Sequence, residues 1–126
     1  MKYSVDQQER YSIFKLEDAN LNSSLAPELK SQFIMLSNHG VRNLIFDISS
    51  VEYIDSSGLS AILTANRLYN AEGTFIVTGV KSPSVEKLIK ISRLDTILTI
   101  IPTVSESKDY VNMKALEDEI NAGGNE

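Results

Sequence analysis

The sequence predicts an α/β fold, with a mixed, mostly parallel sheet of about five strands covered by about four helices. From Asn43 onward, short apolar runs alternate with segments whose apolar residues recur every three or four positions. Strands and helices alternate in this way when right-handed crossovers join parallel strands. Earlier in the chain, residues 3–7 and 11–16 have strand-like spacing on either side of Glu9 and Arg10. This pattern predicts an antiparallel hairpin whose N-terminal strand lies at the edge of the sheet.

The first helix is expected from about residue 25 to residue 38. Pro27 is tolerated there because it falls in the first turn, and His39-Gly40 is typical of a helix end. The apolar residues that fall on one face of this helix are Leu25, Leu29, Phe33 and Leu36. Asn43–Ile48 is a nearly continuous apolar run, which indicates a central strand buried on both faces.

The second half of the chain predicts three more helices. One follows Gly58 and is closed by Gly73, with Leu59, Ile62, Leu63, Asn66 and Tyr69 at helical spacing. Another has Ser82 as its N-cap, and the last opens with a capping box from Thr103 to Glu106. The strands between the helices are expected at residues 74–78 and 97–101. The apolar side of the last helix is expected to consist of Tyr110, Met113, Leu116 and Ile120.

The length and composition indicate one packed domain. The chain has 126 residues, of which 42% are hydrophobic and 23% charged, as in ordinary globular proteins. We expect a single domain over residues 1–120 and a frayed tail over residues 121–126, which contain two glycines.

Composition excludes or disfavours several classes of function. The chain has no cysteine, so it has no disulfide, thiol nucleophile or thiolate metal site. Its net charge is −5 with scattered Lys and Arg residues, which argues against nucleic acid as the main partner. Its apolar runs are too short to cross a membrane, and its start has no signal-peptide core. We therefore expect a cytoplasmic protein without cofactor or metal.

The segment from Asp47 to Leu59 concentrates three acidic residues and four serines between a predicted buried strand and a helix. Asp55, Ser56 or Ser57 can cap that helix by accepting hydrogen bonds from its first N–H groups. A serine in the first turn is also a favourable place for a phosphate, because the helix dipole stabilises its charge of about −1.5 to −2. Gly58 either leaves room beside these hydroxyls for another protein's active site or simply permits a tight backbone.

The motif residues resemble those of a known family. Phe46-Asp47-Ile48-Ser49, then Val51, then Tyr53–Leu59 resemble the central motif of the STAS domain family, and in particular of its anti-sigma factor antagonists. The predicted element order is similar to that fold from residue 3 to residue 118. The resemblance implies that Ser57, just before the motif glycine, is phosphorylated by an anti-sigma factor with serine kinase activity. It also implies that the unphosphorylated protein binds this anti-sigma factor, and that a serine phosphatase resets the cycle.

The partner-binding surface is expected to join the motif to the loop around Asn22. Asn22 stands where family members often carry an acidic residue, so this chain lacks a charge there. The residues expected to bind the partner are Asn22, Ser23, Asp55, Ser56, Gly58 and Leu59. An alternative is a STAS scaffold, or a subunit of a signalling or lipid-transport assembly, in which Ser57 is never modified.

Enzyme activity is not expected. Asp47 ends a strand as the nucleophile of an aspartate phosphatase does, but the position that needs a second acid is Ser49. The Gly-x-Ser-x-Gly elbow of serine hydrolases is absent, and the single histidine, His39, lies at a predicted helix end. No glycine-rich phosphate loop indicates a nucleotide site.

Overall fold

The computed structural model describes residues 1–124 and contains a five-stranded sheet. The strands are β1 (Tyr3–Gln7), β2 (Ser12–Leu16), β4 (Asn43–Asp47), β6 (Thr74–Thr78) and β7 (Thr99–Ile101). Their order in the sheet is β1-β2-β4-β6-β7. β1 is antiparallel to β2, and the other neighbouring pairs are parallel. The predicted fold class is therefore confirmed, with the hairpin strand β1 at one edge.

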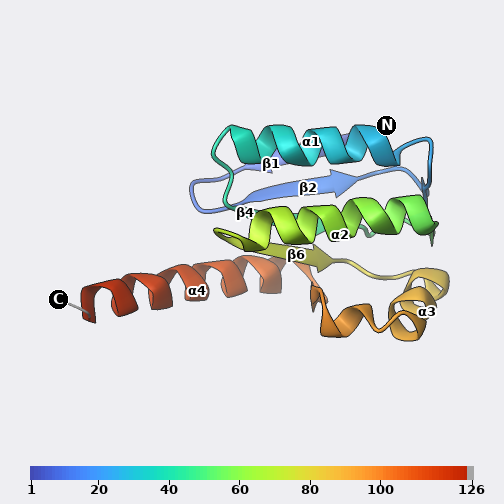
Figure 1. The fold of residues 1–126 in the computed structure, drawn as a ribbon. Helices are drawn as coiled ribbons and strands as arrows, with labels where there is room; N and C mark the ends of the chain where they lie inside the picture. Colours follow the sequence, from blue (N-terminus) through green and yellow to red (C-terminus); the bar gives the residue numbers. More distant parts are fainter. Residues whose placement is uncertain (125–126) are drawn as a thin grey trace.

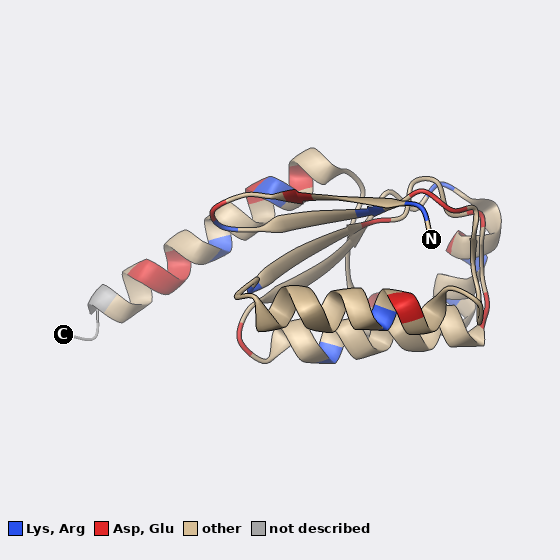
Figure 2. Cartoon of the chain, turned by 90° about the horizontal axis from the view of Figure 1, so that it is seen from above, with Lys and Arg blue, Asp and Glu red and all other residues tan. Residues whose placement is uncertain are grey.

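Residues 1–124 contain four α-helices, three of which cover the two faces of this sheet unequally. The helices are α1 (Ala26–Asn38), α2 (Ser56–Asn70), α3 (Pro83–Ile91) and α4 (Val104–Gly124). α1 and α2 lie side by side on one face, whereas α4 lies on the opposite face and extends past the end of the strands (Figure 1; Figure 2). One face is thus covered along its length, and the other meets only the first part of a single helix.

The face covered by α1 and α2 has an aromatic core. Phe33 from α1 packs against Phe46 of the central strand, with ring centroids 5.1 Å apart at an interplanar angle of 85°. Phe14 and Phe75, on the strands to either side, also contact Phe33. The four rings are fully buried. Edge-to-face contacts of this kind add to the stability gained by burying apolar area.

The opposite face has a small core, and α4 does not pack there as the sequence indicated. Val111 of α4 contacts Ile13, Ile45 and Ile76 from three adjacent strands, and Ser107 is buried on the same side of the helix. The predicted apolar side of α4, formed by Tyr110, Met113, Leu116 and Ile120, is 39–65% exposed. The helical periodicity was predicted correctly, but the side of the helix that faces the sheet is a different one.

Two boundaries in the second half differ from the predicted ones. The last strand begins at Thr99 and not at Ile97, because residues 94–96 form a 3₁₀ turn after Arg93, whose φ is +53°. Gly73 is not the C-cap of α2, which ends at Asn70 with Ala71 as its C-cap. A Cβ at Gly73 would overlap the carbonyl oxygen of Arg42, so the glycine permits a close approach of two backbones.

The predicted caps of the last two helices are confirmed. Ser82 Oγ accepts a hydrogen bond from the Val85 amide at 3.5 Å and so caps α3. Thr103 Oγ1 accepts from the Glu106 amide at 3.1 Å at the start of α4.

α4 continues to Gly124, although fraying was expected from residue 121. The remainder of that predicted tail, residues 125 and 126, lies outside the described residues. None of the helices within residues 1–124 combines the length and the apolar character that a membrane span needs.

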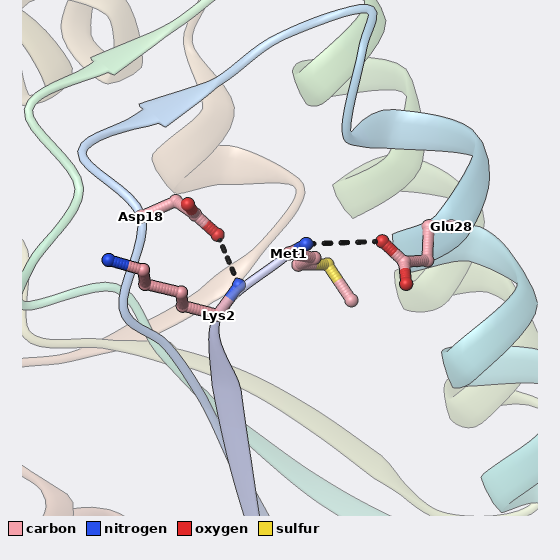
Figure 3. A network of polar contacts seen from close by, with 4 residues as sticks. All are labelled: Met1, Lys2, Asp18 and Glu28. Carbon is pink, nitrogen blue, oxygen red and sulfur yellow. Dashed lines mark hydrogen bonds and ion pairs between the residues drawn. The ribbon is translucent and has the colours of Figure 1, made fainter.

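Polar contacts at the N-terminus attach the edge hairpin to its surroundings (Figure 3). The Met1 amino group lies 3.6 Å from the Glu28 carboxylate of α1. The Lys2 amide donates to Asp18 Oδ2 at 2.7 Å, just after β2. The start of the chain is therefore held against the same helix layer that carries the aromatic core.

Candidate functional site

A second, two-stranded sheet brings the motif next to a loop more than 30 residues earlier in the chain. β3 (Asn20–Leu21) pairs in parallel with β5 (Tyr53–Ile54). The Leu21 carbonyl accepts a hydrogen bond from the Asp55 amide at 3.1 Å. The sequence analysis did not predict this pair, because two-residue strands are too short to show a hydrophobic period. The pair places the loop before α1 beside the first turn of α2.

Asp55 is the N-cap of α2 and also connects the two loops. Its Oδ1 accepts from the Gly58 amide at 2.9 Å, as an N-cap carboxylate does. Its Oδ2 accepts from the Ser23 amide at 3.1 Å. Of the three residues that the sequence offered as caps, Asp55 therefore holds the position, and both of its carboxylate oxygens are used.

Ser57 is the second residue of α2 and is half-buried, with Ser56 exposed beside it. Within residues 1–124, the Ser57 hydroxyl makes no hydrogen bond, and the N-cap of the helix is Asp55. Phosphoryl transfer to a serine needs a hydroxyl that another protein can reach, in a segment that need not unfold. Ser57 is partly exposed, lines an open cavity and lies in the first turn of a helix.

Gly58 has a packing role that the sequence did not indicate. It is buried, and a Cβ at this position would overlap the carbonyl oxygen of Leu21 and lie 2.7 Å from Leu21 Cγ. The glycine is needed because the loop before α1 lies directly on the first turn of α2. The suggestion that it leaves room for another protein is wrong, since Leu21 fills that room.

Asn22 shapes the loop that enters α1. Its Oδ1 accepts from the Ser24 amide at 3.0 Å, and its backbone carbonyl accepts from the amides of Leu25 and Ala26. The residue that stands at an often acidic position in the family therefore closes a turn in its own loop. Leu59, another expected contact residue, is only partly exposed and packs against the core.

An open cavity of about 270 Å³ lies beside Ser57, between the starts of α1 and α2. Its lining residues are Ser23, Ala26, Pro27, Lys30, Ser56, Ser57 and Ser60. The sequence analysis missed four of these residues as part of the site: Ala26, Pro27, Lys30 and Ser60. Ser60 follows Ser57 by three positions, so helical spacing could have found it. The α1 residues carry no such signal, because only the packing of α1 on α2 places them there.

Asp47, which the sequence analysis compared with a phosphatase nucleophile, is buried and already accepts a hydrogen bond. Its Oδ1 accepts from the Ser49 amide at 2.9 Å and so stabilises the turn after β4. The same loop contains Glu52, whose carbonyl accepts a hydrogen bond from Ser82 Oγ at 2.7 Å. This bond holds the start of α3 against the loop after β4. In the part of the chain that the structure describes, no three His, Asp or Glu side chains lie together as metal ligands do.

Comparison with known proteins places these features in context. The sequence profile of the STAS domain family matches residues 2–107. A candidate anti-sigma factor antagonist from Thermotoga maritima is 30% identical over 77 residues, which are 61% of this chain and 68% of that protein.

Two solved structures have a similar fold. The crystal structure of a candidate anti-sigma factor antagonist from Thermotoga maritima superposes with a TM-score of 0.76 at 25% identity, covering 87% of this chain and 94% of the other. The Bacillus cell fate determinant SpoIIAA in its phosphorylated form superposes with a TM-score of 0.67 at 19% identity, covering 87% and 99%.

Proposed function

This chain belongs to the STAS domain family, and we propose that it acts as an anti-sigma factor antagonist switched by phosphorylation of Ser57. The single observation that carries the proposal is the half-exposed Ser57 in the first turn of α2, whose hydroxyl has no hydrogen-bond partner within residues 1–124 and is not needed as the helix cap, which is Asp55. The similarity to a candidate anti-sigma factor antagonist from Thermotoga maritima supports the class of partner. The existence of a phosphorylated form of the similarly folded SpoIIAA supports the modification.

The proposed reaction takes place on this chain but is catalysed by its partner. The anti-sigma factor, acting as a serine kinase, transfers the γ-phosphoryl group of ATP to Ser57 Oγ. The new Oγ–P bond replaces the P–O bond to ADP, and the hydroxyl proton passes to a base of the kinase. A serine phosphatase later hydrolyses the phosphoester with water. This chain itself is not catalytic, and the cycle belongs in the cytoplasm, where ATP is available.

The switch acts through charge at the docking surface. We propose that this surface is formed by Asn22, Ser23, Asp55, Ser56 and the exposed part of Leu59, around Ser57. A phosphate there adds a charge of about −1.5 to −2. Binding of the partner is then weaker, because the charge must be desolvated and is repelled at the interface. A loss of about 3 kcal/mol in binding free energy lowers the affinity more than a hundredfold. α2 stays capped in both states, since Asp55 and not Ser57 holds the amide of Gly58.

The test is to incubate the protein with ATP and candidate kinase-type anti-sigma factors. Mass spectrometry should locate one phosphate on Ser57. Ser57→Ala should bind the same anti-sigma factor with or without ATP, and Ser57→Asp should bind it at least tenfold more weakly. Ser84→Ala is the matched control, because Ser84 is an exposed serine at the same position of α3, outside this surface, and the variant should still be phosphorylated and released.

Equal binding by Ser57→Ala and Ser57→Asp would refute the switch. The protein would then be a scaffold or an assembly subunit, whose Ser57 is never modified. Phosphate-affinity electrophoresis of protein from growing and starved cells distinguishes the two functions. The switch requires a shifted species under one of these conditions, whereas a scaffold gives a single unshifted band.

A further inference from the structure

Lys30 lies beside Ser57 although it belongs to another helix. It is half-buried on α1, and its Nζ donates to Ser60 Oγ of α2 at 3.3 Å. Ser60 follows Ser57 by three positions, so the two side chains are neighbours on the surface of α2. Lys30, Ser57 and Ser60 all line the same cavity. The ammonium group is therefore held within one helical turn of the Ser57 hydroxyl.

Lys30 is one of the few charged residues on the surface formed by α1 and α2. Glu28 and Lys30 are the only charged residues of α1, and Arg67 is the only one of α2, so the two helices are nearly free of charge (Figure 2). Within residues 1–124, Lys30 forms no ion pair. Its hydrogen bond to a neutral hydroxyl leaves the positive charge of the ammonium group uncompensated.

Neither Asp55 nor Glu28 forms an ion pair with Lys30. Asp55 uses one carboxylate oxygen for the Gly58 amide and the other for the Ser23 amide. Glu28, the other acidic residue of α1, lies 3.6 Å from the Met1 amino group. An anion added at the cavity would therefore find a cation in place whose charge is not already paired.

We propose that Lys30 binds the phosphate of modified Ser57. Its ammonium group leaves Ser60 Oγ and pairs with the phosphate oxygens, so that an ion pair across the cavity joins α1 to α2 only in the phosphorylated state. This inference rests on the proposed function, because it concerns the phosphate that the switch adds. Lys30 acts as a positioning residue: it fixes where the phosphate lies on the docking surface and partly neutralises it.

Electrostatics favours the movement of the Lys30 ammonium group from Ser60 Oγ to the phosphate. A hydrogen bond between an ammonium group and a doubly charged phosphate is stronger than one to a hydroxyl. A lysine side chain has four rotatable bonds, so a movement of a few ångströms needs no change in α1. Arg67 cannot take this role, because it follows Ser57 by ten residues and so lies about 15 Å along the helix.

The experiment uses the full chain with phosphoserine incorporated at position 57 by genetic encoding, so that no kinase is needed. Phosphorus NMR titration measures the second pKa of the phosphate, which is about 6 for free phosphoserine. A nearby cation stabilises the dianion and lowers this pKa. Relative to the unsubstituted chain, Lys30→Gln should raise it by about 0.5, the scale of a partly exposed ion pair. Lys30→Arg should keep it low.

The matched control is Arg67→Gln, which removes one positive charge from the same surface at a greater distance. Its effect on the phosphate pKa should be close to zero, because the separation exceeds the Debye length of about 10 Å at 0.1 M salt. The proposal is overturned if Lys30→Gln leaves the pKa unchanged, or if Arg67→Gln raises it as much. Neither outcome bears on whether a kinase modifies Ser57, which the incubation with ATP decides separately.

Discussion

The two faces of the central sheet differ in how they are covered and in what they carry. On one face, α1 and α2 bury four phenylalanines; on the other, α4 contributes Val111 to a small aliphatic cluster. The candidate site is built from the starts of α1 and α2 and the loops before them, all on the first face. Its groups are therefore held by the best-packed part of the molecule. A reaction at Ser57 can change the surface charge while this framework stays in place.

The largest expected effect tests this difference in packing directly. Phe33→Ala should lower the free energy of unfolding by about 3–5 kcal/mol, because it removes the ring that Phe14, Phe46 and Phe75 all contact. Val111→Ala on the other face removes only two methyl groups and should cost about 1–2 kcal/mol. Urea unfolding of both variants measures the two costs. Similar losses would mean that α4 stabilises the sheet as much as the paired helices do.

A smaller effect is expected where the site is joined to the well-packed face. Gly58→Ala should destabilise the fold by about 1–3 kcal/mol, because the new methyl group overlaps the backbone and side chain of Leu21. Ser56→Ala, two residues earlier and exposed, should change stability by less than about 0.5 kcal/mol. Thermal unfolding of the two variants makes the comparison. If they melt alike, the loop before α1 is free to move away from α2.

The smallest effect concerns a single hydrogen bond between the two helices, and it depends on pH. The Tyr69 hydroxyl of α2 donates to the Phe33 carbonyl of α1 at 2.6 Å, and burial raises the pKa of Tyr69 to about 12. An unfolded tyrosine has a pKa near 10. The stabilisation by this group is therefore complete below about pH 10, and it is lost as the pH rises from about 10 to about 12.

Comparison with Tyr69→Phe isolates this effect from other groups that titrate in the same range. The unsubstituted protein should be more stable than the variant by about 1 kcal/mol below pH 10, and the difference should shrink at higher pH. Urea unfolding of both proteins at several pH values measures it. A difference that stays constant between about pH 9 and about pH 11.5 would mean that Tyr69 ionises equally easily in the folded and unfolded chains.

Much of the fold could be predicted because its signals are local. The N-caps at Ser82 and Thr103 depend on a hydroxyl and an amide three residues later, and both were confirmed. The antiparallel hairpin and the buried central strand follow from patterns five or six residues long. α4 shows where such patterns fail. Its apolar stripe has the correct period, but the sheet contacts Ser107 and Val111 on another side.

The sequence by itself determined the order of the four helices and of the strands of the five-stranded sheet, and placed Ser57 in the first turn of a helix next to residues able to cap it. Tertiary structure decided that Asp55 also accepts from the Ser23 amide, that Leu21 lies on Gly58, and that Lys30 reaches the surroundings of Ser57. The reason is the range of each interaction. Periodicity and capping act between residues a few positions apart, whereas these contacts join segments about 30 positions apart that only strand pairing and helix packing bring together.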